Sequence, residues 1–100
     1  PGAMFPLDAF VVNLSESSAR RYLKATIALE FGGAPKDEEV AKKMPQIRDA
    51  VIVLLSSKSL DDVASTQGKI QIRKEIMHRV NRIVGEPPVR GVYYTEFVIQ

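Results

Sequence analysis

Few side chains in this 100-residue chain belong to the types that catalysis or metal binding requires. His78 is the only histidine and there is no cysteine, which excludes a two-histidine metal site and any thiolate nucleophile or ligand. Glu75 precedes His78 by three residues, so a helix would place both on one face as a candidate acid–base or metal pair. Because no second histidine or cysteine completes such a site, we predict that His78 is exposed and has no catalytic role.

Serines, lysines and paired carboxylates occur in other patterns that resemble reactive motifs only superficially. The segment 56–59 reads Ser-Ser-Lys-Ser, but a serine–lysine nucleophile needs a desolvated lysine, and this one is surrounded by polar residues. The carboxylate pairs at 38–39 and 61–62 suit solvated helix starts, and the glycines at 32–33 lack the Lys-Ser/Thr ending of a phosphate loop. We therefore predict a domain that is not an enzyme and uses no metal or cofactor.

Basic residues exceed acidic residues only slightly, by 14 to 12, which gives a net charge of +2. Nucleic-acid binding usually needs a concentrated basic face, so we predict no nucleic-acid partner. The basic residues between 69 and 82 lie on the polar side of a predicted helix. They form either a solvated face or a docking surface for an acidic protein or anionic lipid headgroups. They are Lys69, Arg73, Lys74, Arg79 and Arg82.

Length and composition predict one globular domain. A chain of 100 residues that is 45% hydrophobic and 26% charged can form one core. No apolar run approaches the roughly 20 residues that a membrane-spanning helix needs. Residues 1–4, Pro-Gly-Ala-Met, read as a cloning scar, and we expect residues 5–100 to be a domain whose natural N-terminal extension is missing.

Three segments have the composition of β-strands. Residues 10–14 are short and rich in β-branched and aromatic types. Residues 20–31 alternate strictly, which predicts a half-buried strand with Leu23, Ala25, Ile27, Leu29 and Phe31 on one face. Residues 89–100 form a last strand with apolar residues at both parities, which predicts a strand that is covered on both faces or lies centrally in the sheet.

Two long helices are predicted between the second and third strands. The first begins near an N-cap at Asp37, continues to residue 55, and kinks at Pro45. A short turn at 60–64 follows, and Ser65 or Thr66 then caps a second helix that ends before Gly85. The buried stripe of this second helix is predicted to contain Ile72, Ile76, Val80 and Ile83, widened by Ile70, Met77 and Val84. The order β-β-α-α-β predicts an α+β fold in which two helices cover one face of a sheet of about three strands.

A series of short motifs from Leu7 to the last residue resembles the FliL family of flagellar basal-body-associated proteins in order and spacing. The motifs are Asn13-Leu14, Arg21-Tyr22-Leu23-Lys24, Met44-Pro45-Gln46-Ile47-Arg48-Asp49-Ala50, Leu54-Leu55-Ser56-Ser57-Lys58, Gly68-Lys69 and Val92-Tyr93-Tyr94-Thr95-Glu96-Phe97-Val98-Ile99-Gln100. The resemblance implies a fold similar to the stomatin (SPFH-type) domain.

The same resemblance implies a role in flagellar motility. It implies a single-pass protein of the bacterial inner membrane whose periplasmic domain associates with the flagellar stator proteins and supports torque generation and swarming. Self-association into a ring is the mechanism that it implies, with the membrane reached through an N-terminal span that this sequence lacks. The alternative is a scaffold or anionic-lipid-binding adaptor unrelated to the flagellum.

Nine residues are candidates for contact or structural roles. The protein-contact candidates are Tyr22, Lys24, Arg73, Arg79 and Tyr94. Both tyrosines fit a core or sheet-covering role equally well. The residues of the family-like motifs with an expected structural role are Asn13, Arg48, Asp49 and Phe97, of which Arg48 and Asp49 are expected to form surface charge pairs and Phe97 to anchor the core beside Tyr93 and Ile99.

Overall fold

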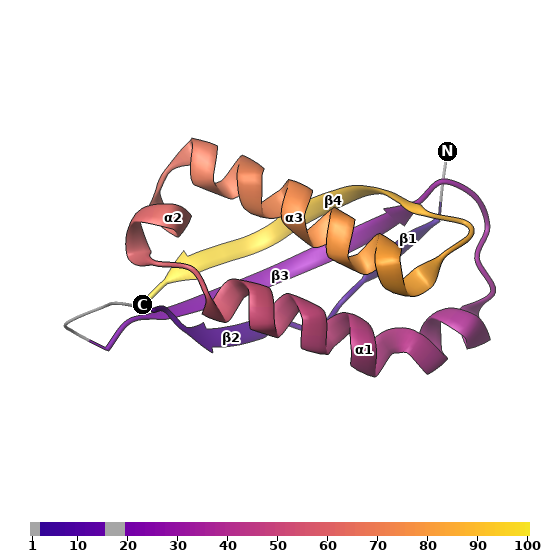
Figure 1. The fold of residues 1–100 in the computed structure, drawn as a ribbon, viewed down its shortest axis with the longest axis horizontal. Helices are drawn as coiled ribbons and strands as arrows, with labels where there is room; N and C mark the ends of the chain where they lie inside the picture. Colours follow the sequence, from indigo (N-terminus) through magenta and orange to yellow (C-terminus); the bar gives the residue numbers. More distant parts are fainter. Residues whose placement is uncertain (1–2, 16–19) are drawn as a thin grey trace.

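The computed structural model describes residues 3–15 and 20–100 and confirms the predicted α+β class (Figure 1). Pro1 and Gly2 of the expected cloning scar lie outside the described residues, whereas Met4 begins the first strand. The elements are β1 (Met4–Pro6), β2 (Phe10–Asn13), β3 (Tyr22–Phe31), α1 (Asp37–Ser56), α2 (Leu60–Ala64), α3 (Thr66–Val84) and β4 (Val89–Ile99). The similarity to the stomatin-type fold stays a prediction.

The sheet has four antiparallel strands, and β3 is the central one. β4 pairs with β3 from Leu23↔Ile99 to Phe31↔Val89, while β2 and β1 follow one another along the opposite edge of β3. The sequence prediction missed β1 because a strand of three residues that contains a proline is too short to show alternation. Placing the last strand centrally was also wrong, since β4 forms an edge of the sheet.

Irregular pairing explains why apolar residues of β4 occur at both parities. The register against β3 shifts between Thr26 and Ile27 and again between Glu30 and Phe31. Each shift sets an extra residue of β4, Thr95 or Arg90, into the ladder and so moves the following side chains to the other parity. The side chains that face the helices are therefore Val89, Val92, Tyr94, Phe97 and Ile99. The prediction of a strand covered on both faces was wrong, because Tyr93 and Val98 are exposed.

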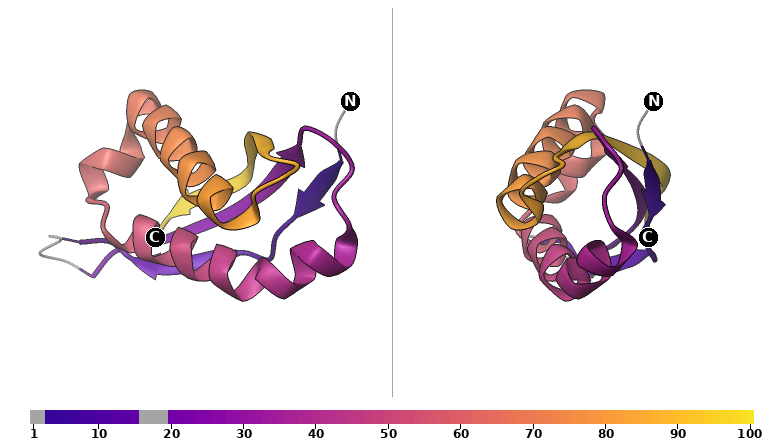
Figure 2. Two further views of the ribbon diagram at one scale, coloured as in Figure 1. Left: turned by 45° about the vertical axis from the view of Figure 1, so that its right-hand side comes forward. Right: turned by 90° about the vertical axis from the view of Figure 1, so that its right-hand side faces the viewer.

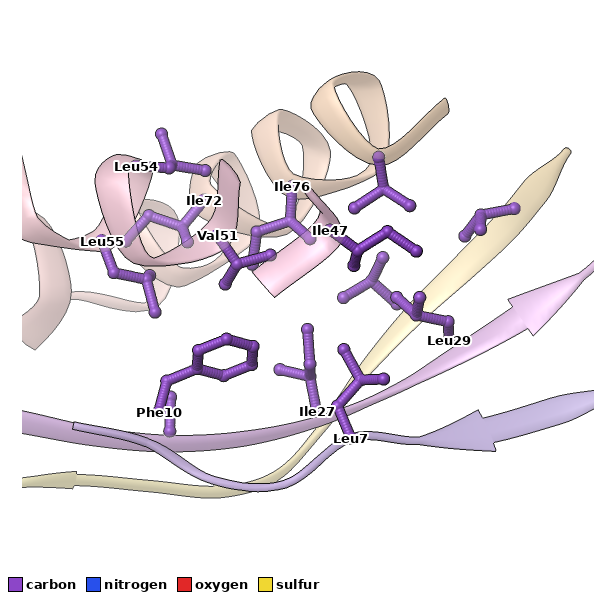
Figure 3. Close-up of a cluster of buried hydrophobic side chains, with 14 of the residues drawn as sticks. Leu7, Phe10, Ile27, Leu29, Ile47, Val51, Leu54, Leu55, Ile72 and Ile76 are labelled. Atoms are coloured by element: carbon purple, nitrogen blue, oxygen red, sulfur yellow. The ribbon is translucent and has the colours of Figure 1, made fainter. Parts of the chain in front are cut away.

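The three helices of the described residues lie on one face of the sheet, and none of them covers the other face (Figure 2). The core fills the space between the two layers, with Phe10 and Ile27 of the sheet beneath Ile47 and Ile76 of the helices (Figure 3). The predicted alternation of β3 is confirmed, since its core-facing residues are all buried. No helix of the described residues is both long and apolar enough to span a bilayer.

The predicted helices are confirmed, with differences in detail. α1 begins at Asp37, so Lys36 and not Asp37 is the N-cap residue. Pro45 lies within α1 on its exposed side, and the kink expected there stays a prediction. In α3 the buried stripe ends at Val84 where Ile83 was expected, and Ile70 is 36% exposed.

Side-chain caps position the short helix α2 against α3. Ser59 and Asp62 form a reciprocal capping box at the start of α2, and the Ser65 hydroxyl accepts from the Gly68 amide at the start of α3. α3 ends at Gly85, whose φ of 70° favours glycine.

Candidate protein-contact surfaces

The face of the sheet opposite the helices, which we call the helix-free face, presents one charged residue between two apolar residues. Strand register places Val11 of β2 and Val98 of β4 on either side of Lys24. The valines are 62% and 41% exposed. The Lys24 ammonium lies 3.6 Å from a carboxylate oxygen of Glu96, which also accepts from the Thr26 hydroxyl at 3.0 Å. The predicted contact residue Lys24 is thus held in place beside two exposed valines.

Tyr22, the other predicted contact residue on β3, lies one pleat away from Lys24 on the same face and is half-buried. Its strand partner is Asn13, the exposed last residue of β2. Sequence reasoning found Tyr22 and Lys24 from the alternation of β3 but missed Val11 and Val98. The missing information was the register, which no local pattern supplies.

A second polar cluster on the helix-free face joins Glu30, Arg90 and Tyr93. One carboxylate oxygen of Glu30 accepts from the Tyr93 hydroxyl at 2.7 Å, and the other lies 3.2 Å from the Arg90 guanidinium. These hydrogen bonds, that of Tyr93 foremost, lower the pKa of Glu30 below its usual value. The same hydrogen bond raises the pKa of Tyr93. Sequence reasoning missed this cluster because Glu30 and Tyr93 are 63 positions apart.

Two of the predicted contact residues, Arg73 and Tyr94, meet on the opposite face, between β4 and α3. The Tyr94 hydroxyl donates to the Lys69 carbonyl at 2.7 Å, and the Arg73 guanidinium lies 5.1 Å from the centre of the Tyr94 ring. Phe97 packs edge-to-face on Tyr94 with ring centres 5.0 Å apart. Burial raises the pKa of Tyr94 to about 12. The hydroxyl and ring of Tyr94 therefore bind strand to helix.

Arg79 lies apart from the other predicted contact residues, on the outer side of α3. It is exposed beside His78 in a groove that Ala50 of α1 also lines. The carboxylate of Glu75 lies 2.8 Å from the Lys58 ammonium, so this glutamate is ion-paired across to the α1–α2 connection. Among residues 3–15 and 20–100, no group of three or more histidine, aspartate or glutamate side chains could hold a metal ion.

Arg48 has a different role from the one we expected. Its guanidinium donates to the carbonyls of Asp8 at 2.8 Å and Ala9 at 3.2 Å, and it stacks 4.1 Å from the centre of the Phe10 ring. Arg48 therefore binds main-chain carbonyls where a surface charge pair was expected, and these contacts fasten α1 to the link between β1 and β2. Phe97 was also misplaced, since it shares its face with Tyr94 and Ile99 and not with Tyr93.

A pocket of about 350 Å³ lies at the end of the molecule where the β3–α1 and α3–β4 connections meet. The Gly32 amide joins the two connections by donating to the Pro88 carbonyl at 2.8 Å. Lys43 at the pocket donates to the Val84 carbonyl at 3.2 Å. Sequence reasoning did not find this pocket, because its residues come from segments on both sides of the long helical connection.

The fold and these surfaces define a class of protein: a small α+β domain with candidate contact surfaces. A sequence model described as "Flagellar basal body-associated protein FliL" matches residues 4–100. The chain belongs to the FliL family, which associates it with the bacterial flagellum, its basal body and motility.

Relatives with established names agree with this assignment. The chain is 43% identical over 100 residues to the flagellar protein FliL of Aquifex aeolicus, a match that covers 99% of the chain and 62% of that protein. It is 33% identical over 78 residues to FliL of Bacillus subtilis, covering 78% of the chain and 56% of that protein. A 25% match to the FliL protein of Caulobacter vibrioides covers 95% of the chain and 47% of that protein. The chain thus spans roughly half to three fifths of the length of these relatives.

Proposed function

We propose that this chain is the non-catalytic periplasmic domain of a single-pass inner-membrane protein that associates with flagellar stator proteins. In this role it supports torque generation and swarming, and the membrane-anchored protein self-associates into a ring. Family membership supports a flagellar role. Stator contact, ring assembly and anchoring through an N-terminal span are the further steps of the proposal.

The helix-free face of the sheet is the observation that carries the proposal. A sheet with helices on one side only leaves its other side to solvent or to a partner. Here that side presents Val11 and Val98 around Lys24, held by Glu96. Exposed apolar side chains flanked by fixed charges can contribute to a protein contact through burial and electrostatic fit. The domain would then act by contact and not by chemistry.

Photo-cross-linking in motile cells tests this surface with two matched valines. A photoreactive residue at Val98 in the full-length protein should cross-link to a stator subunit, whereas one at Val53 on the outer side of α1 should not. Val53 is 54% exposed and Val98 41%, so the control position is at least as accessible. Val98→Glu should reduce swarming while Val53→Glu leaves it unchanged, with thermal melts confirming that both variants fold. Stator cross-links from Val53 alone would move the contact to the helical side.

The lipid-binding alternative is favoured by the exposed cations on α3. Lys74, Arg79 and Arg82 take part in none of the ion pairs formed by the described residues. Juxtaposed basic side chains attract anionic membranes by about 1 kcal/mol each. Sedimentation with anionic vesicles checks this alternative. If the protein binds the vesicles, and Arg82→Glu abolishes this binding while stator cross-linking stays normal, the lipid contact is separate from the stator contact.

A further inference from the structure

A shallow groove runs along the outer surface of α3 and reaches α1 at Ala50, and we call it the α1–α3 groove. It consists of two adjoining hollows of about 290 and 630 Å³ that share His78 and Arg79. Along α3 the groove extends from Gln71 to Ile83, a distance of about 18 Å at the usual rise of an α-helix. Its dimensions suit about three turns of a docked helix.

One wall of the groove is basic. Lys74, His78, Arg79 and Arg82 all line it from α3 and are all exposed. The acidic side chain in the lining, Glu75, is ion-paired with Lys58 at 2.8 Å. The groove therefore carries an excess of positive charge that the described part of the chain does not neutralise by ion pairing. This excess favours an acidic occupant.

The other wall and the floor are apolar. Ala50 of α1 and Ile83 of α3 line the larger hollow. The acidic residue next to Ala50, Asp49, is exposed on the same helix. A basic wall beside an apolar floor complements the two faces of an amphipathic acidic helix.

We propose that the α1–α3 groove is a docking site for an acidic amphipathic helix of a partner protein. This site is separate from the helix-free face that carries the proposed function. The apolar pair Ala50 and Ile83 distinguishes a helix from a membrane surface as the occupant. A helix can bury apolar side chains against Ala50 and Ile83, whereas a flat layer of headgroups contacts only the protruding cations.

The test uses a synthetic peptide of about 16 residues with glutamate on one helical face and leucine on the other. The same peptide with lysine in place of glutamate is its control. Fluorescence anisotropy should show that the acidic peptide binds and the lysine peptide does not. Arg79→Glu should weaken the affinity for the acidic peptide about tenfold. Arg20→Glu, which makes the same charge change outside the groove, should leave that affinity unchanged. Equal binding of both peptides would overturn the proposal.

Ala50→Arg separates groove docking from attraction to a charged surface. The new side chain fills the floor while adding positive charge, so docking should weaken about tenfold even though electrostatic attraction increases. Ala41→Arg, on an exposed position of the same helix, should leave binding unchanged. The proposal would be overturned if Ala50→Arg preserved or strengthened peptide binding. It would also be overturned if the domain bound anionic vesicles and not the peptide. Thermal melts of each variant exclude loss of folding as the cause.

Discussion

Tyr94 links the last strand to α3 through three kinds of contact. Its hydroxyl donates to the Lys69 carbonyl, its ring packs against Phe97, and the Arg73 guanidinium covers the ring. The charged form of a phenol loses hydration when it is buried, which explains why the pKa of Tyr94 rises from 10.0 to about 12. The protonated hydroxyl is also the form that can donate to the carbonyl.

This shift predicts how stability changes at alkaline pH. Between pH 10 and about 12 the folded domain keeps a proton on Tyr94 that the unfolded chain has lost, so the free energy of unfolding falls as the pH rises through this window. Below pH 10 the contribution is fully present. Tyr94→Phe should cost about 0.5 to 1.5 kcal/mol at neutral pH and make this alkaline fall smaller. Urea denaturation across the pH range measures both effects, and an unchanged alkaline fall would contradict the assignment to Tyr94.

Arg48 predicts a second stability effect, which arises from main-chain contacts. Arg48→Ala removes two charged hydrogen bonds to the carbonyls of Asp8 and Ala9 as well as the stacking on Phe10, and should lower the free energy of unfolding by about 1.5 to 3 kcal/mol. Arg79→Ala, which removes an exposed arginine, should change it by less than about 0.5 kcal/mol. Similar losses for both variants in urea melts would contradict this role.

The motif that contains Arg48 was recognisable in the sequence, but the partners of Arg48 were not. Arg48 and Asp49 were expected to form charge pairs at the helix surface because both are charged residues of the family-like motif. The actual acceptors lie 39 and 40 positions away, at a break in the sheet edge. Locating them requires knowing that two short strands share one edge of β3.

At the scale of elements, the start of α3 depends on a close approach of two helices. A side chain at Gly68 would collide with the main-chain carbonyl of Asp62 in α2. Gly→Ala within a helix ordinarily gains up to about 1 kcal/mol, but Gly68→Ala should cost about 1 to 3 kcal/mol because a main-chain atom must move. Gly32→Ala is the control, since its Cβ would meet the Pro88 carbonyl oxygen at an ordinary 3.5 Å. A stabilised Gly68→Ala variant in thermal melts would contradict the close approach.

The position of Phe97 on β4 gives a prediction about packing. Phe97 is half-buried at the margin of the core, whereas Phe10 is 1% exposed within it. Phe97→Ala should therefore cost about 1.5 to 3 kcal/mol and Phe10→Ala about 3 to 5 kcal/mol. Denaturant melts of both variants test this order. A larger loss for Phe97→Ala would return it to the central anchor role that the sequence suggested.

The strands and helices differ in how much of them the sequence reveals. Periodicity of 3.6 in α3 and of two in β3 identified most of the buried positions, because each element keeps one face towards the core along its whole length. In β4 the register shifts at Thr95 and Arg90 reverse the faces twice, so a constant period of two assigns Tyr93 to the wrong side. Bulges depend on the partner strand and leave no reliable local signal.

At the scale of the whole molecule, the domain combines a completed core with several surfaces that remain free. The helices bury one face of the sheet. The α1–α3 groove, the helix-free face and the end pocket lie on different sides of the domain. The sequence predicted the two layers and the candidate residues on them. It did not predict the surfaces, since each of these is assembled from segments that meet only in the folded chain.

These free surfaces predict how the isolated domain associates. Charged side chains interrupt its exposed apolar residues, as Lys24 does between Val11 and Val98, so contacts between copies should be weak in solution. Light scattering of the isolated domain should give a mass near the 11.1 kDa of one chain at low concentration and rise only at high concentration. A membrane anchor confines copies and orients them, which can increase avidity by about 10² to 10⁴.

The proposed ring requires that this confinement changes the outcome. Full-length protein in nanodiscs or detergent should assemble under conditions in which the isolated domain is monomeric, and a repeated head-to-tail contact would close if its rotation permits. A stable oligomer of the isolated domain at low concentration would show that the contacts are strong by themselves. Full-length protein that also remains monomeric would remove the physical basis for a ring, and an adaptor that binds one stator unit through the helix-free face would then explain the domain better.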